Sequence, residues 1–284
     1  MQRTLRVVLF AICFSTAAVG QTPQTPQTWS GILSDSTCGG SHRAMSSAAG
    51  MTERECAFHC LKALAKYVLV DQNGTVSRIA NQDFAGLPLR LARPVRLTGQ
   101  MTDNGILITR IEPPLVHAHI GHVMTAWRDT PGTVGLLTVA ASDVRVAAAH
   151  ALLTSKSETL DDMKLHAGHV LHALDPAVEP KGPASGYGSK KATAGGLQHV
   201  GFAASVEGAS PAVKTHAGVV STKLTDTIAT IDRAIATAQK IRAAAASAEA
   251  LTLTGELVSQ ISQIGDGIES AQQEMRLMMK AEGL

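Results

Sequence analysis

Three histidines recur at every third residue in the stretch LHAGHVLHALDP, which runs from Leu165 to Pro176. They are His166, His169 and His172. On a helix that turns about 100° per residue these positions form one stripe, so neighbouring imidazoles can reach a common point. Neutral imidazole is a common protein ligand for zinc, copper and nickel, and it is also an axial ligand for haem iron. The spacing therefore indicates metal or haem binding.

A second pair with the same spacing, His119 and His122, lies earlier in the chain. In both segments the apolar residues share one helical face and most of the histidines turn away from it. A solvated helix face also tolerates histidine, and that alternative stays open. Because one pair supplies too few ligands for a tight site, we expect His119 and His122 to combine with His166, His169 or His172 between two neighbouring helices. Further candidate ligands are His150, His199 and His216.

A second candidate site contains Cys38, His42, Cys56 and Cys60. Cys56 and Cys60 are one helical turn apart and share a face, whereas His59 is rotated off that face and is expected to be exposed. Three thiolates and one imidazole can form a tetrahedral metal site. Alternatively, Cys38 forms a disulfide with Cys56 or Cys60, which leaves one unpaired thiol in the mature chain. Both interpretations stay open.

Residues 29–113 are expected to form a small domain rich in strands. Short alternating runs bounded by turns predict five strands, at 29–34, 67–70, 75–79, 95–100 and 106–111. One helix is predicted over 52–66. This content favours a five-stranded barrel of the oligonucleotide-binding (OB) type. Nucleic acid is not an expected partner, because the strands carry almost no aromatic rings on which bases could stack.

Residues 114–284 are expected to form an all-α helical bundle, so the fold class is α+β with two domains. The last two helices are amphipathic and should pack as an antiparallel hairpin. Gly265-Asp266-Gly267 predicts a kink or break in the last of them. The stretch 175–191 predicts a long loop, for which a lid and a flexible connection are the alternatives and a connection is favoured. Helices are predicted over 116–128, 133–154, 160–174, 192–206, 211–246 and 254–281.

The beginning of the chain indicates export. Residues 1–20 have a positive start at Arg3 and Arg6, an apolar core and small residues at the end, as in a cleaved signal peptide that carries Cys13 away with it. Residues 21–28 are a polar, proline-containing linker. The net charge of +2 provides no basic field for nucleic acid or an anionic membrane. We expect a periplasmic or secreted protein without a membrane span, and the sequence leaves its oligomeric state open.

Both halves resemble known proteins. The first resembles a family of small secreted bacterial OB-like domains of unknown function, which implies no activity. The residues that carry this resemblance are Trp29, Gly31, Leu33, Asp35, Cys38, Gly39, His42, Cys56, Cys60 and 66–70. The second half, through His119-Ile-Gly-His122 and His166-Ala-Gly-His169-Val-Leu-His172, is similar to His-rich helical-bundle metal-binding proteins of bacterial periplasms. That resemblance implies binding of copper, nickel or zinc without catalysis.

The function expected from the sequence is metal binding for buffering, storage or resistance. One alternative is an electron-transfer protein that holds haem b between two histidines of facing helices. Another is an interaction or structural protein of the cell envelope without a cofactor. An enzyme is not expected, because the sequence contains no Gly-rich phosphate loop, no Gly-x-Ser-x-Gly turn and no His-Glu-x-x-His motif.

Overall fold

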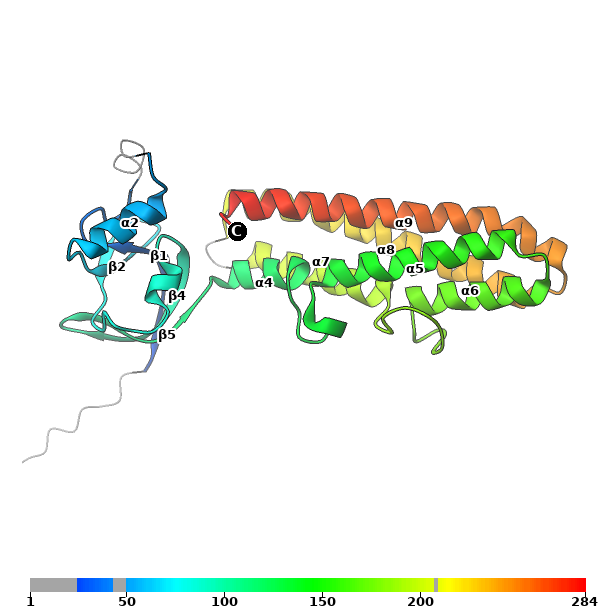
Figure 1. The fold of residues 1–284 in the computed structure, drawn as a ribbon, viewed down its shortest axis with the longest axis horizontal. Helices are drawn as coiled ribbons and strands as arrows, with labels where there is room; N and C mark the ends of the chain where they lie inside the picture. Colours follow the sequence, from blue (N-terminus) through cyan, green and yellow to red (C-terminus); the bar gives the residue numbers. More distant parts are fainter. Residues whose placement is uncertain (1–24, 43–49, 207–208) are drawn as a thin grey trace, which may run out of the picture. The chain divides into compact units, whose positions relative to one another are not determined.

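The computed structural model describes residues 25–42, 50–206 and 209–284 (Figure 1). The predicted signal segment, Cys13 and residues 21–24 of the predicted linker lie outside these ranges. The chain divides into two compact units. The first ends at Ile111, and the second runs from Glu112 to Leu284 and also takes in residues 94–96.

The first unit contains a five-stranded antiparallel sheet in the order β3-β2-β1-β4-β5. In the register of the first two strands, Leu33 lies opposite Leu69. The five predicted strands are confirmed, but the sheet is open and does not form the predicted closed barrel. The strand β3 has only three residues, which leaves little backbone for a further ladder, and an isolated parallel bridge joins Ile79 to Ile106. The strands are β1 (Gln27–Asp35), β2 (Tyr67–Val70), β3 (Val76–Arg78), β4 (Pro94–Thr102) and β5 (Gly105–Glu112).

The helix α2 (Glu53–Lys62) presents two cysteines to the interior of the first unit. A capping box starts it: the Thr52 side chain accepts from the Glu55 backbone N–H, and the Glu55 carboxylate accepts from the Thr52 backbone N–H. The helix ends before Leu64, which has a positive φ of 71°, and so it is shorter than the predicted 52–66. A short helix, α3 (Leu87–Arg90), was not predicted.

In the part of the second unit that the structure describes there are six α-helices and a short 3-10 helix, η1 (Pro131–Thr133). The first four α-helices follow one another in two pairs, α4 with α5 and α6 with α7, and each pair, here called an interrupted helix, is broken by a loop between its two halves (Figure 1). The long helices α8 and α9 pack closely along each other. The helix α4 contacts α7, whereas α5 contacts α6. Their bounds are α4 (Leu115–Met124), α5 (Leu136–Lys156), α6 (Leu160–Leu174), α7 (Ser189–Ser205), α8 (Pro211–Ala243) and α9 (Ser247–Ala281).

The amphipathic stripes of these helices build two clusters of buried side chains. One cluster contains Leu171 and Ile261, and the other contains Ile120 and Met275. Of the helices that the structure describes, α5 has the length and apolar content of a membrane span, and 44% of its apolar window is buried inside the unit. Contacts of α5 with α6, α7 and α9 account for that apolar content.

The predicted break at Gly265-Asp266-Gly267 is wrong, because α9 continues through it. A Cβ atom on Gly267 would lie 2.3 Å from Oγ1 of Thr227 on α8. Glycine at this position therefore allows the two long helices to approach closely and does not end α9.

A buried carboxylate fixes the loop between α6 and α7. Asp143 on α5 is 1% exposed and accepts hydrogen bonds from the Ser185 backbone N–H (3.0 Å), the Ser185 hydroxyl (2.7 Å) and the Gly188 backbone N–H (3.1 Å). Gly188 is the residue that precedes α7, so Asp143 positions the start of that helix.

Candidate metal centres

The first histidine triad joins α4 to α7. His119 and His122 lie one helical turn apart on α4, and His199 reaches them from α7. The Nδ1 atom of His199 lies 3.1 Å from Nδ1 of His119 and 3.4 Å from Nδ1 of His122. His199 is buried and the two α4 histidines are partly buried.

The second triad joins α6 to α5. His166 and His169 lie one turn apart on α6, and His150 reaches them from α5. The Nδ1 atom of His150 lies 3.1 Å from Nδ1 of His166 and 3.3 Å from Nδ1 of His169. All three residues are partly buried.

The two triads have nearly the same geometry. In each, a His-x-x-His pair on one helix faces a single histidine, here called the hub, on a second helix. The ring centroids of hub and first pair member are 5.3 Å apart in both triads. Those of hub and second pair member are 4.8 Å apart in the first triad and 4.5 Å in the second, with near-perpendicular rings.

The two interrupted helices account for this likeness. Each carries its pair in its first half, within His119-Ile-Gly-His122 or His166-Ala-Gly-His169, and its hub in its second half. The pairing of α4 with α7 and of α5 with α6 places the first half of each interrupted helix against the second half of the other. Each hub therefore serves the pair of the other interrupted helix.

The nitrogen separations suit a shared metal ion. Two imidazole nitrogens bound at about 2.0–2.1 Å to one ion, at angles between square and tetrahedral, lie roughly 2.9–3.4 Å apart. The four hub-to-pair distances of 3.1–3.4 Å fall in that range. A neutral hub Nδ1 carries either one proton or one lone pair, so it cannot make good hydrogen bonds to two nitrogens at once. A central ion would satisfy all three nitrogens.

Burial favours the neutral, metal-binding form of these imidazoles. It lowers the pKa of His119, His122, His150 and His169 below the ordinary 6.5. Burial, followed by the repulsion of charge on His122 and His119, lowers the pKa of His199 to about 4. Protons therefore compete weakly with a metal ion for these nitrogens near neutral pH.

We expect the metal-free protein to become less stable as the pH falls from about 6.5 toward about 4. The pKa of His199 in the folded chain, about 4, lies below the ordinary 6.5. In that window the unfolded chain binds a proton that the folded triad excludes, so the free energy of unfolding decreases with falling pH. Urea unfolding with a chelator present, near neutral pH and near pH 5, measures the decrease. The change His199→Gln should make it smaller, and an equal decrease in both proteins would contradict this origin.

The structure corrects the expectation of one shared site between the two pairs. His119 and His122 group with His199, whereas His166 and His169 group with His150. Two other candidates have different partners. The Nδ1 atom of His172 lies 2.9 Å from the Glu179 carbonyl oxygen, and Nδ1 of His216 lies 2.7 Å from the Glu274 carboxylate.

Aromatic rings, which the sequence analysis did not assign to the site, surround the first triad. The Trp127 ring centroid lies 4.6 Å from that of His122 and 4.7 Å from that of His199. Phe202 contacts the same triad, 5.3 Å from His119. Trp127 could have been recognised from the sequence as a neighbour of the site, because it comes just after the helix that carries the histidine pair. These rings give the first triad a more apolar rim and a fluorescent reporter.

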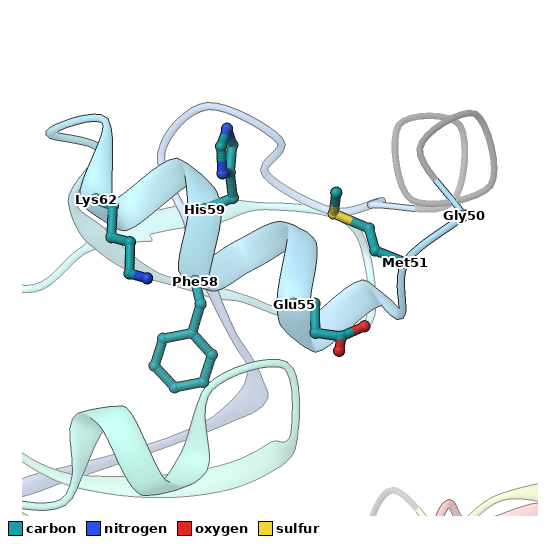
Figure 2. Close-up of a pocket in the computed structure, with 6 residues that line it drawn as sticks. All are labelled: Gly50, Met51, Glu55, Phe58, His59 and Lys62. Atoms are coloured by element: carbon teal, nitrogen blue, oxygen red, sulfur yellow. The ribbon is translucent and has the colours of Figure 1, made fainter.

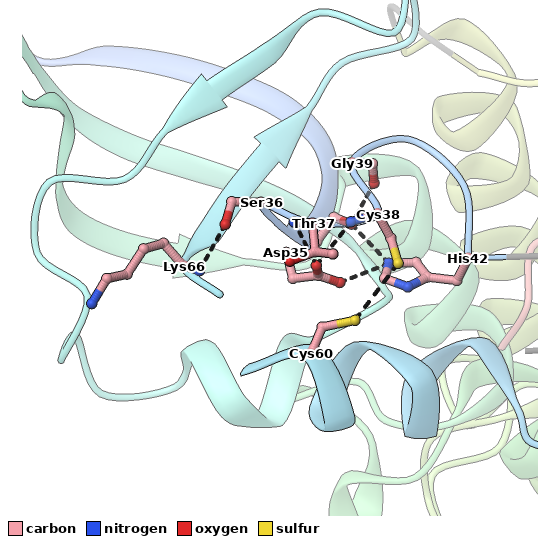
Figure 3. Close-up of polar contacts among 9 residues, drawn as sticks. Asp35, Ser36, Thr37, Cys38, Gly39, His42, Cys60 and Lys66 are labelled. Atoms are coloured by element: carbon pink, nitrogen blue, oxygen red, sulfur yellow. Dashed lines mark hydrogen bonds and ion pairs between the residues drawn. The ribbon is translucent and has the colours of Figure 1, made fainter. Parts of the chain in front are cut away.

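A third cluster lies in the first unit (Figure 3). The sulphur atoms of Cys38 and Cys60 face each other at 3.6 Å, and the His42 ring lies beside the Asp35 carboxylate. Cys56 belongs to the same neighbourhood, in a group with Cys38 and His42. Cys38 also belongs to a second group, with Cys60 and Asp35, so the predicted residues lie in two groups that share Cys38. Burial raises the pKa of the Cys60 thiol and, together with a hydrogen bond to Cys60, raises that of Cys38 to about 12.

A hollow of about 580 Å³ lies on the outer side of α2 (Figure 2). Phe58 and His59 leave the helix on opposite sides. The ionisable groups along its edge, Glu55, His59 and Lys62, are all exposed. A ligand pocket usually has convergent polar groups within an apolar cavity, and these exposed side chains do not provide them.

The chemistry of this chain is inferred from the geometry of its own residues. No family model, no curated protein and no solved structure matches it.

Proposed function

We propose that the second unit binds two transition-metal ions, one in each histidine triad. One observation carries the proposal: six histidines from four helices sort into two triads of like geometry, with nitrogen separations that fit a bound ion. Histidines that are merely tolerated on solvated helix faces would not be expected to point toward one another in groups of three. Two such convergences in one bundle support a binding role.

The donor set favours copper, nickel or zinc. Imidazole nitrogen suits these ions, and the Irving–Williams order places copper(II) first among them. Three protein ligands leave at least one position open, whereas structural zinc sites are closed by four. Five of the six histidines are only partly buried, so an ion can exchange with solvent. These features support a role in metal buffering, storage or resistance. The signal peptide predicted over residues 1–20 would place that role in the periplasm or outside the cell.

The geometry does not favour haem. A haem between two axial histidines needs a planar slot between their rings. Within each triad the ring centroids are only 4.5–5.8 Å apart and the hub nitrogens face the pair directly, so the rings themselves fill that space. A small ion fits between these rings and a porphyrin does not.

Metal counting on the full chain tests the proposal. Protein stripped with a chelator is dialysed against Cu²⁺, Ni²⁺ or Zn²⁺, and the bound metal is measured by elemental analysis. X-ray absorption at the metal edge then separates nitrogen from sulphur ligands. We expect two nitrogen-bound ions per chain, in addition to any ion that the cysteines of the first unit bind, and tighter binding of copper than of nickel or zinc at the triads. Failure to bind any ion through nitrogen would favour a bundle without a cofactor.

A further inference from the structure

We infer that the first unit holds a separate zinc site, with Cys38, Cys56, Cys60 and His42 as ligands and Asp35 as the residue that orients His42. This site is independent of the two histidine triads, because it lies in the other unit and uses sulphur. Three thiolates and one imidazole are a common tetrahedral set for a structural zinc ion.

The elements of the first unit bring these ligands together. The turn after β1 carries Cys38, and α2 presents Cys56 and Cys60, which are 2% and 4% exposed. The ligand atoms of Cys38, His42 and Cys56 lie within 4.8 Å of one another, and those of Cys38, Cys60 and Asp35 form a second group of the same size. Two sulphurs bound at about 2.3 Å to one tetrahedral zinc ion lie roughly 3.8 Å apart. The 3.6 Å between Cys38 and Cys60 is close to that value and well above the roughly 2.05 Å of a disulfide.

His42 is prepared for coordination. It is 4% exposed, and its Nε2 atom lies 2.9 Å from the Ser34 hydroxyl and 3.4 Å from the Asp35 carboxylate. Its Nδ1 atom is buried and has no hydrogen-bond partner among the described residues. A metal-binding histidine usually donates its other ring N–H to a carboxylate, which fixes the tautomer. The Ser34 hydroxyl, which donates to the Gly39 carbonyl, is placed to accept that hydrogen bond from Nε2, and the Asp35 carboxylate beside it favours a proton on the same nitrogen. The Nδ1 atom is then left for the metal.

Asp35 also shapes the turn that carries the first cysteine. Its side chain is fully buried, and Oδ1 accepts the backbone N–H groups of Thr37 (2.8 Å) and Cys38 (3.0 Å). The second oxygen, Oδ2, is the one that faces His42. Asp35 thus positions two of the four ligands, Cys38 and His42. Burial of a carboxylate is costly unless it makes such contacts, and these contacts explain an acid in a site otherwise made of thiols and imidazole.

Cobalt substitution in the full chain tests the site. The chain carries Cys13→Ser, so that every remaining thiol belongs to the cluster, and it is reduced and stripped of metal without oxygen. One equivalent of Co²⁺ should produce an intense sulphur-to-cobalt band and the visible bands of a tetrahedral ion, and Zn²⁺ should abolish them. The histidine triads contain no sulphur, so this band reports the first unit even if the triads bind nothing.

Variants separate the roles. His42→Gln should keep the sulphur band but change the visible bands, whereas His59→Gln, the matched control on the exposed side of α2, should change neither. Asp35→Asn should keep both bands at saturation but weaken affinity by about 10- to 100-fold, because it acts through His42. Zinc-edge absorption on the double variant His150→Gln, His199→Gln, in which both triads lack their hub, counts the sulphur ligands of this site alone and should find three.

Two results would overturn the inference. One is a folded, fully reduced chain that gives no sulphur-to-cobalt band and no sulphur at the zinc edge. The other is a Cys38–Cys60 disulfide that persists with excess thiol reductant and zinc present, which would make the cluster a structural disulfide with Cys56 left over.

Discussion

Replacing His199 by glutamine is expected to remove one of the two metal ions bound by the histidine triads and to leave the other in place. His199 is the hub of the first triad, and without it the pair on α4 has only two ligands. The loss of affinity should exceed the roughly 10- to 100-fold that removal of a ligand's hydrogen-bond partner costs. His150→Gln should have the same effect on the second triad, and the double variant should bind neither ion.

Trp127 identifies which triad has lost its ion. In a chain with Trp29→Phe it is the remaining tryptophan of the two in the sequence, and its ring contacts His122 and His199. Copper(II) quenches fluorescence at such short range. Quenching should therefore disappear with His199→Gln and persist with His150→Gln.

His216→Gln is the matched control, because His216 pairs with Glu274 outside both triads. It should retain two ions and normal quenching. The account of two independent triads fails if either hub variant loses both ions, or if His216→Gln behaves like the hub variants.

Replacing Asp143 by alanine is expected to destabilise the helical unit by about 3 kcal/mol. The change removes an acceptor of three hydrogen bonds, and the Gly188 N–H that it leaves behind is buried. A buried donor without a partner costs about 1–3 kcal/mol, and the start of α7 loses its anchor as well. Because α7 carries His199, binding at the first triad should weaken too.

Urea unfolding followed by circular dichroism measures this effect on the helices. Asp143→Asn keeps one acceptor oxygen and should lie between the wild type and Asp143→Ala. Asp266→Ala, at an exposed position of α9, is the control and should change stability by less than about 0.5 kcal/mol. If Asp143→Ala matches that control, the carboxylate does not hold the loop.

Most of the secondary structure could be predicted because its signals are local. The alternating runs gave the five strands, and the amphipathic stripes gave the long helices. The Gly265-Asp266-Gly267 prediction failed because the space beside Gly267 is set by Thr227 on another helix. Barrel closure failed for a similar reason, since it depends on how much backbone β3 offers to a strand distant in the sequence.

The histidine pairs could be recognised from their spacing, but their partners could not. Pair members are one turn apart on one helix, which the sequence shows directly. The hubs His150 and His199 were candidates without an assigned pair, because the assignment depends on which interrupted helices pack together. His172 continues the stripe of His166 and His169 in sequence, yet it turns to the Glu179 carbonyl on the following loop.

The cysteine cluster, too, could be predicted only in part from the sequence. The three cysteines and His42 were found from residue type and helical spacing. Asp35 was noticed only as part of a resemblance, and nothing local shows that its carboxylate is fully buried with one oxygen facing His42. Burial and pairing of this kind arise from tertiary packing.

Anomalous diffraction at the metal edge, from crystals of the full chain loaded with copper or zinc, tests the central claim most directly. It should show one ion among His119, His122 and His199 and another among His150, His166 and His169, each about 2.0–2.1 Å from its nitrogens. A single ion shared by the α4 and α6 pairs, or metal-loaded crystals without density at either triad, would contradict it.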